Sequence, residues 1–126
     1  MKRTVLFLEA LFGLIAYDLI LVLGRFKRVR ALVGRWKVAK RNASPELTDE
    51  IVDAVNLACV CYPKQVLCLQ RAAVTACLMR SHGVAADMVL GAQKTPFAAH
   101  AWVEVQGRPI NEKPNVQTKY TVWERY

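Results

Sequence analysis

The sequence predicts an α+β fold in which helices come first and a small antiparallel sheet follows. Before residue 82, apolar residues recur at helical spacing between signals that begin and end helices. After that point, short runs of alternating apolar and polar residues are separated by turn residues. The 126 residues suffice for one compact domain, and 54% hydrophobic residues exclude a disordered chain.

Two helices are expected at the start of the chain. The first covers residues 4–23 and ends near Gly24, and the second is a basic helix over residues 25–40. The first resembles a signal anchor in its length and apolar character. However, Glu9 and Asp18 interrupt it, and each carboxylate would be costly in the middle of a bilayer. We therefore expect a helix that docks on the domain or on a partner, with peripheral membrane contact left open.

The third and fourth helices have clearer boundaries. Ser44 is a good N-cap, Pro45 suits the first helical position, and the Tyr-Pro pair after Cys61 ends the third helix. The fourth is expected over residues 66–81, with Gly83 in the capping position that follows its last turn.

The second half of the chain predicts an antiparallel sheet. Gln106 and Gly107 suit a two-residue hairpin turn between two strands. A connection over residues 94–98 precedes the second strand, and the last residues of the chain add a candidate fourth strand. The expected strands are residues 86–93, 99–105, 108–111 and 119–126.

The positive charge is concentrated at the front of the chain. Residues 1–41 hold ten Lys and Arg against two acids, whereas residues 42–126 hold eight of each sign, so the net charge of +8 belongs to the first part. We expect residues 1–41 to form a basic, apolar helical extension packed on a domain over residues 42–126. Its charge is typical of a surface for an acidic partner or a membrane, or of a solvated face. No nucleic-acid-binding motif accompanies it, and no nucleic acid is expected.

The cysteines and histidines do not form a metal motif. No paired C-x-x-C spacing is present, so we expect neither a zinc site nor any other cofactor. Nothing marks the chain as secreted, and a reduced, cytoplasmic location is expected, with the inner membrane surface as a possible site of attachment. These residues are Cys59, Cys61, Cys68, Cys77, His82 and His100.

Cys68 is the candidate nucleophile among the four cysteines. It falls in the first turn of the fourth helix, where free backbone N–H groups and the helix dipole favour a thiolate and can hold an oxyanion. It also lies on a narrow polar stripe of that helix, and the other three cysteines are expected in the core. Cysteine more often simply packs, so helix position alone does not decide its role. The stripe comprises Lys64, Cys68, Arg71, Thr75 and His82.

His100 is the candidate base. By itself, a histidine in a half-exposed strand more often has only a packing role. However, a cysteine at a helix start followed by a histidine on a later strand is the arrangement of thiol proteases. If Gln106 and Gly107 form the turn, paired positions sum to 213, and Asn111 lies diagonal to His100 on one sheet face. Glu112 then points to the other face unless the strand bulges or ends there, so geometry alone favours Asn111 as the group that orients His100.

Several motifs together resemble a known family. They are CLQRA at 68–72, LMRSHGVAADMVLG at 78–91 and HAWVEVQGRPIN at 100–111, preceded by apolar and then basic helices. The chain resembles the transglutaminase-like leader peptidases of lasso-peptide maturation, which are related to the C-terminal half of microcin J25-processing proteins. The resemblance implies a transglutaminase-like or papain-like cysteine protease core.

The resemblance also implies residue roles. Cys68 would be the nucleophile and His100 the general base. The third member in this family is usually the Asp of an Asn-Asp pair, and that position falls here on Glu112. Because Asn111 could orient a histidine as in papain-like proteases, both Asn111 and Glu112 stay candidates.

The implied function is removal of the leader from a ribosomally made lasso-peptide precursor. Family members act with a small leader-recognition domain, expected here as a separate chain, and a macrolactam synthetase acts next. Two alternatives stay open. One is another acyl-transfer enzyme on the same fold, since water and an amine acceptor cannot be told apart from these residues. The other is a non-catalytic binding module that uses the basic helices.

Overall fold

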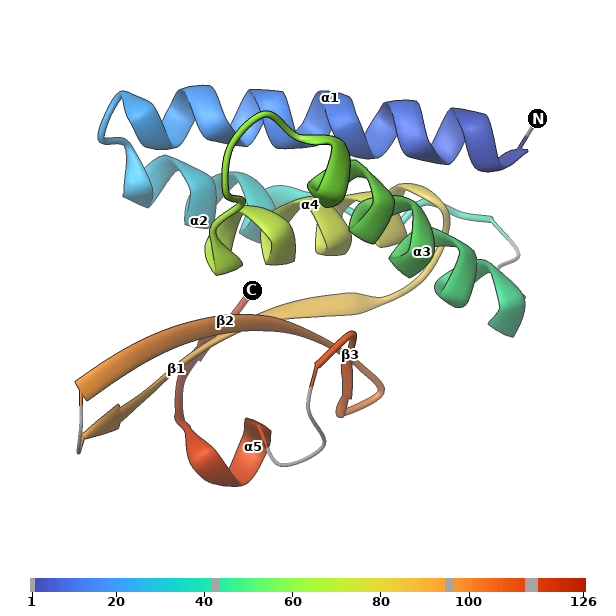
Figure 1. Ribbon diagram of the computed structural model, residues 1–126. Coiled ribbons are helices and arrows are strands. Elements are labelled where there is room, and N and C mark those ends of the chain that lie inside the picture. Colours follow the sequence, from blue (N-terminus) through green and yellow to red (C-terminus); the bar gives the residue numbers. More distant parts are fainter. Residues whose placement is uncertain (1, 42–43, 95–96, 113–115) are drawn as a thin grey trace.

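The structure is a computed structural model that describes residues 2–41, 44–94, 97–112 and 116–126. Helix α1 lies over a layer formed by α2, α3 and α4, and the sheet lies beneath that layer (Figure 1). This helices-then-sheet arrangement confirms the predicted α+β class. The elements are α1 Lys2–Val22, α2 Phe26–Arg35, α3 Pro45–Cys61, α4 Cys68–Ser81, β1 Ala86–Lys94, β2 Phe97–Val105, β3 Arg108–Ile110, α5 Val116–Lys119 and β4 Thr121–Arg125.

Helix α4 is the centre of the hydrophobic core. It packs against α1 on one side and against β1 and β2 on the other, so 11 of its 14 residues are buried. Even the buried amide of Gln70 has a partner, since its Nε2 donates to the backbone oxygen of Leu14 in α1 at 2.7 Å. A helix enclosed in this way can present reactive groups only at its ends, and Cys68 is its first residue.

Helix α1 contributes one face to this core. Leu6, Ala10, Leu14 and Tyr17 are at most 4% exposed, and the Tyr17 hydroxyl lies 2.9 Å from the thiol of Cys77. Within the described residues, the stretch Arg3–Val22 is long and apolar enough to cross a membrane by length and composition alone.

The helix boundaries follow the prediction except in α2. Helix α3 covers the predicted residues, and α4 begins two residues later than expected. Helix α2 ends at Arg35, not near residue 40, and the chain then runs extended past Trp36. The reason is a distant side chain: Arg80 of α4 donates to the backbone oxygens of Val33 and of Trp36, the latter at 3.1 Å. These bonds, and one from the Ala39 N–H to the Arg80 carbonyl at 2.8 Å, replace further helical turns.

Arg80 also fastens the C-terminus of the chain. Its Nε donates to the Ala86 carbonyl at the start of β1 at 2.7 Å, and its Nη2 donates to the carbonyl of Tyr126. A buried guanidinium is tolerated because each of its three nitrogens donates to a backbone carbonyl. One side chain thereby joins α2, β1 and the end of the chain.

The sheet has four antiparallel strands in the order β3-β2-β1-β4. Val105 pairs with Arg108, and Val103 pairs with Ile110, which confirms the predicted hairpin register. The backbone φ angles of Gln106 (53°) and Gly107 (77°) are both positive, as a tight two-residue hairpin turn of the right twist requires.

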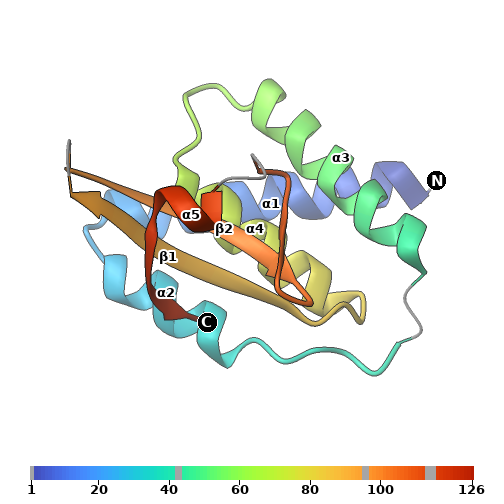
Figure 2. The same ribbon diagram turned by 90° about the horizontal axis from the view of Figure 1, so that it is seen from below.

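The C-terminal segment forms the predicted last strand and has two features that the prediction did not specify. Strand β4 pairs with β1, on the side of the sheet away from β3, with a bulge between Leu90 and Gly91. The short helix α5, which the sequence did not suggest, precedes β4 and covers the sheet face that points away from the other helices (Figure 2). A glycine is required at position 91 of β1, because a Cβ atom at this position would lie 2.8 Å from the indole of Trp102.

Candidate active site

Cys68 begins α4 without a conventional cap. Leu67, the N-cap residue, has extended backbone angles, and its N–H donates to the Oε1 of Gln70 at 3.4 Å. The Arg71 N–H is the first to bond within the helix, to the Leu67 carbonyl at 3.0 Å. The N–H groups of the first turn before Arg71 therefore have no acceptor within the helix. The Cys68 thiol is partly buried and packs against the core.

His100 lies on β2 opposite Gly91 of β1. Its Nε2 is 2.8 Å from the Oε2 of Glu112, a distance at which an Nε2–H donates to a carboxylate. The two side chains are 19% and 13% exposed, so the bond is largely shielded from water. The Nδ1 atom is thereby the ring nitrogen left for proton exchange with a substrate or a nucleophile.

Glu112 reaches His100 because the backbone turns after β3. The strand ends at Ile110, and Asn111 has a left-handed φ of 57°. The face alternation on which the register argument depended therefore stops one residue early. The same Oε2 atom of Glu112 lies 3.8 Å from the Nη2 of Arg71 in α4. The carboxylate thus joins the histidine on the sheet to the helix that carries Cys68.

Asn111 has a different partner from the one expected. Its Nδ2 donates to the Oδ1 of Asn56 at 2.7 Å, and the Nδ2 of Asn56 donates back to its Oδ1 at 3.2 Å. This pair of amides ties the end of β3 to α3. Of the two candidates for orienting His100, the structure places Glu112 beside the ring and places Asn111 against α3.

The start of α4 lies over the first half of β2, the half that carries His100 (Figures 1 and 2). Strand β3 pairs only with Val103–Val105, so beside His100 this edge of β2 is not covered by β3. Arg71, one turn after Cys68, contacts Glu112 there. Among the described residues no hydrogen bond joins the Cys68 thiol to His100, a contact that catalytic pairs often form only once a substrate is bound.

Two aromatic rings hold His100 in place. The imidazole stacks at 5.9 Å from the ring centroid of Trp102 and at 5.3 Å from that of Tyr120. Tyr120 follows α5, far from β2 in the sequence, and no sequence pattern linked it to His100. The two rings restrict how the imidazole can turn about its bond to the strand.

A buried carboxylate supports this aromatic group. Glu104 is 1% exposed, and its Oε2 accepts from the Trp102 indole at 2.8 Å and from Gln117 at 2.9 Å. Arg125 of β4 pairs with its other oxygen. Burial alone would raise the pKa of Glu104, but the bonds from Arg125, Gln117 and Trp102 hold it below its usual value. A period of two from His100 could have identified Trp102 and Glu104 as neighbours on one sheet face.

The residues of the polar stripe predicted for α4 do not all lie at the site. Cys68 and Arg71 lie at the site, and the Thr75 hydroxyl bonds to the Arg71 carbonyl at 2.8 Å. Lys64 pairs with Asp18 of α1 at 2.8 Å, and His82 pairs with Glu9 at 3.2 Å. Asp18 and Glu9 are the carboxylates that interrupt the apolar sequence of α1, and both bind side chains of the domain on which the helix docks.

The other cysteines are only partly as predicted. Cys77 is buried, and its burial raises its thiol pKa. Cys59 is half-buried, and burial raises its thiol pKa as well. Cys61 is exposed, so its placement in the core was wrong. It is the last residue of α3, where the helix end faces solvent.

Comparisons with known proteins agree with this architecture. A family model described as the transglutaminase-like superfamily matches residues 13–125. The microcin J25-processing protein McjB of Escherichia coli is 40% identical over 45 residues, which are 36% of this chain and 22% of that protein. The match thus spans about a fifth of the relative's length. No solved structure matches the chain significantly. Because the family match runs from within α1 to the end of β4, the chain belongs to the transglutaminase-like superfamily.

Proposed function

We propose that this chain is a cysteine peptidase that removes the leader from a ribosomally made lasso-peptide precursor. The observation that supports it best is the shielded His100–Glu112 pair, whose carboxylate also contacts Arg71, one turn after Cys68 in α4. The similarity to a protein whose name describes microcin J25 processing supports the substrate class.

Cys68 is the nucleophile in this proposal. Its thiol proton passes to Nδ1 of His100, and the thiolate attacks the carbonyl carbon of the peptide bond that joins leader to core. The C–N bond then breaks, and the imidazolium returns the proton to the departing amine of the core. Water, deprotonated by the same imidazole, hydrolyses the thioester and releases the leader as a carboxylic acid.

The surrounding residues support these steps. Glu112 holds the Nε2–H of His100 and so leaves Nδ1 to take the proton of the thiol. Arg71 holds Glu112 from the side of α4 at 3.8 Å. The N–H groups of the first turn of α4 stabilise the oxyanion of the tetrahedral intermediate. Asn111 fixes the end of β3 through Asn56 and thereby fixes where Glu112 begins.

The proposal includes partners outside this chain. The leader peptide is brought to the site by a separate leader-recognition domain, and a macrolactam synthetase closes the ring on the freed core amine. No cofactor takes part, because the thiol, the imidazole and water account for every bond made and broken.

Product masses test the reaction. The chain is incubated with a precursor and its recognition domain, with and without an added primary amine. Free leader acid and free core are expected in both samples. A leader joined to the amine would support the alternative of an amide-forming acyl transferase, which the family and the site also accommodate.

Thiol reactivity separates the enzyme from a non-catalytic module. The wild-type chain is compared with Cys61→Ala, which removes the exposed thiol and leaves Cys68 in place. We expect both proteins to be labelled rapidly at Cys68 by iodoacetamide, with a rate that depends on His100. Slow labelling of Cys68 that is insensitive to His100→Ala would favour the binding module.

A further inference from the structure

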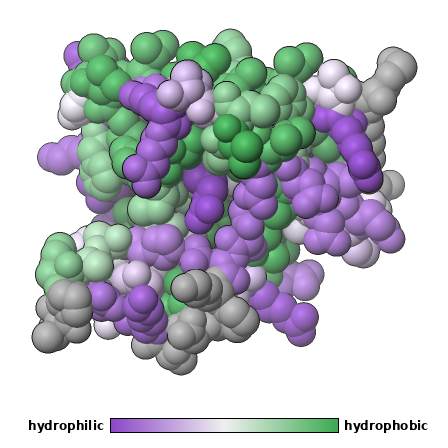
Figure 3. All heavy atoms as spheres, viewed as in Figure 1, coloured by the Kyte–Doolittle hydropathy of each residue, from purple (hydrophilic) through white to green (hydrophobic). Residues whose placement is uncertain are grey.

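Helix α1 carries a continuous apolar stripe on its exposed side. Six side chains make up this α1 stripe, and each is between 45% and 74% exposed. Their spacing alternates between three and four residues, so they line one side of the helix, opposite the face that is buried in the core. No charged residue interrupts them. Figure 3 shows hydrophobic residues gathered along α1 at the top of the view. The stripe comprises Val5, Leu8, Phe12, Ile15, Leu19 and Val22.

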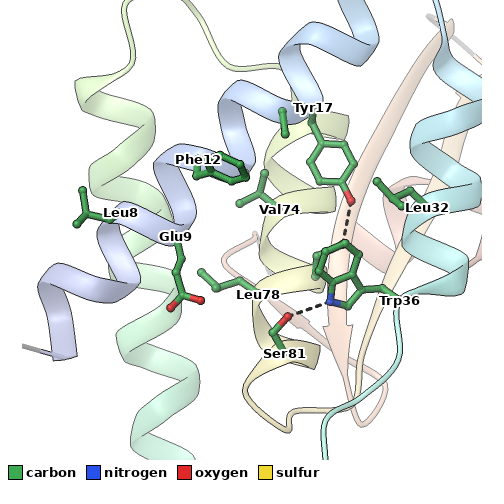
Figure 4. Close-up of a pocket in the computed structure, with 12 residues that line it drawn as sticks. Leu8, Glu9, Phe12, Tyr17, Leu32, Trp36, Val74, Leu78 and Ser81 are labelled. Atoms are coloured by element: carbon green, nitrogen blue, oxygen red, sulfur yellow. Dashed lines mark hydrogen bonds between the residues drawn. The ribbon is translucent and has the colours of Figure 1, made fainter.

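The apolar surface continues onto α2 through a groove. The groove has a volume of about 430 Å³ and lies between α1, α2 and α4. Leu8 and Phe12 border it from α1, and Leu32 and Trp36 border it from the other side (Figure 4). The Trp36 indole is held by Ser81 at 2.9 Å. A tryptophan with one polar edge at the border of an apolar surface is typical of membrane interfaces.

A second groove beside the first adds positive charge. Its volume is about 700 Å³, and Leu32 borders both grooves. Ile20, near the end of α1, and Leu23, just after it, supply more apolar surface. The remaining residues of its wall include three arginines, Arg25, Arg28 and Arg35, and all three are exposed.

We propose that the α1 stripe and these two grooves form a docking surface for an anionic lipid bilayer. The apolar side chains enter the boundary between headgroups and acyl chains, and the arginines bind lipid phosphates. This assignment accounts for two features together: apolar side chains exposed along the whole helix, and a charge excess confined to residues 1–41. It does not depend on the peptidase reaction.

The contacts of α1 favour a helix that lies on the bilayer over one that spans it. Crossing would withdraw Leu6, Leu14 and Tyr17 from the core, where they are at most 4% exposed. It would also separate Asp18 from Lys64 and Tyr62, which bond to it at 2.8 and 2.7 Å. A helix of 21 residues lying flat offers an apolar edge about 30 Å long.

Charge favours lipid over a second copy of this chain. Two α1 stripes packed together would bring the basic N-terminal end and the basic Arg25–Arg28 end of one chain beside basic residues of the other, in either orientation. An anionic surface neutralises both ends at once. Bilayers rich in phosphatidylglycerol provide that chemistry.

Vesicle sedimentation tests the surface with matched variants. The full chain is mixed with vesicles of phosphatidylethanolamine and phosphatidylglycerol, or of phosphatidylcholine alone. Arg28→Gln with Arg35→Gln removes two charges from the surface, and Arg108→Gln with Lys119→Gln removes two from the sheet side. Phe12→Ser removes one apolar contact, and Val60→Ser is its control, because Val60 is 81% exposed on α3.

We expect the wild type to bind the anionic vesicles and to be released by salt. The Arg28/Arg35 variant should bind about 25-fold more weakly, and Phe12→Ser about tenfold more weakly, while both controls bind like the wild type. Equal binding to phosphatidylcholine, no binding to either vesicle, or equal losses in the controls would overturn the proposal. So would a wild-type dimer in analytical ultracentrifugation that Phe12→Ser converts to monomer, since a second copy would then occupy the stripe.

Discussion

The two faces of β2 have different neighbours. Ala101 and Val103 face α4 and belong to the main hydrophobic core. His100, Trp102 and Glu104, on the other face, form a stack and a set of hydrogen bonds with residues of α5, β4 and their connection. One strand therefore contributes apolar packing on one side and oriented polar groups on the other.

The difference shows how a small domain can hold a histidine firmly at the edge of its core. On the α4 face the apolar side chains are held by close packing against the helices, which depends only on their volume and shape. The opposite face lies under short elements, so its side chains are held by directed contacts: rings stacked on the imidazole and donors around Glu104. Substitutions on the first face should change stability, and those at the reactive groups should change the rate.

The largest expected effect is on the nucleophile. Cys68→Ala should abolish leader cleavage and leave the fold intact, because a half-buried first-turn thiol contributes little packing volume. Cleavage is followed by mass spectrometry of the products, and folding by circular dichroism. Cys61→Ala is the control and should cleave like the wild type, since that thiol is exposed at the end of α3. Cleavage by the Cys68 variant at a near wild-type rate would show that the nucleophile is another residue.

His100→Ala comes next. Loss of a general base should lower kcat by about a hundredfold to ten-thousandfold, while the affinity for the precursor changes little. Single-turnover kinetics and a direct binding assay separate the two effects. Weak binding with normal turnover would instead make His100 a recognition residue.

The third largest effect separates Glu112 from Asn111. Glu112→Ala removes the bond to Nε2 of His100, and kcat should fall by up to about a hundredfold, the lower end of what the base supplies. Asn111→Ala breaks the amide pair with Asn56, and it should lower stability more than rate. Both variants are assayed for kcat and for thermal midpoint. The reverse pattern would assign the orienting role to Asn111.

Much of the fold could be predicted because the signals that define it are local. Helix α3 begins at Pro45 and ends just before Pro63, as expected, and the Gln106-Gly107 turn sets the β2–β3 register. The end of α2 could not be predicted, because it depends on Arg80, which is more than forty residues away and takes the carbonyls that another turn would use. The position of β4 beside β1 is likewise a long-range pairing with no local signal.

The candidate site residues could be chosen from the sequence, whereas their surroundings in the fold could not. Cys68 and His100 could be chosen from helix position, residue order and family motif. The register argument pointed to Asn111 because it assumed that β3 continues, whereas the left-handed Asn111 ends it and turns Glu112 toward the ring. Tyr120 was not found, since only the folded chain brings it to His100.

The α4 face of β2 should affect stability alone. Val103→Ala removes two buried methyl groups between the sheet and α4, and the free energy of unfolding should fall by about 2 kcal/mol. Denaturant titration measures the loss, and kcat per folded molecule should stay at the wild-type value. Val60→Ala on the exposed side of α3 is the control and should change stability by less than about 0.5 kcal/mol. A lowered kcat in Val103→Ala would mean that the two faces are coupled.

The opposite face should give the smallest effect, a pH dependence of stability. Glu104 has a pKa below its ordinary value because Arg125, Gln117 and Trp102 bond to its carboxylate, although burial opposes them. A carboxyl whose pKa is lower in the folded state stabilises the fold above its unfolded pKa of about 4.3, and this stabilisation is lost as the pH falls through the folded value. Thermal midpoints of the wild type should therefore drop on the acid side, and those of Glu104→Gln should drop less. Asp18→Asn provides the comparison, because hydrogen bonds from Lys64 and Tyr62 also lower the pKa of Asp18. If the curves of wild type and Glu104→Gln run parallel through the acid range, the carboxylate of Glu104 is not what holds this face together, and the orientation of Trp102 and His100 must come from ring stacking alone.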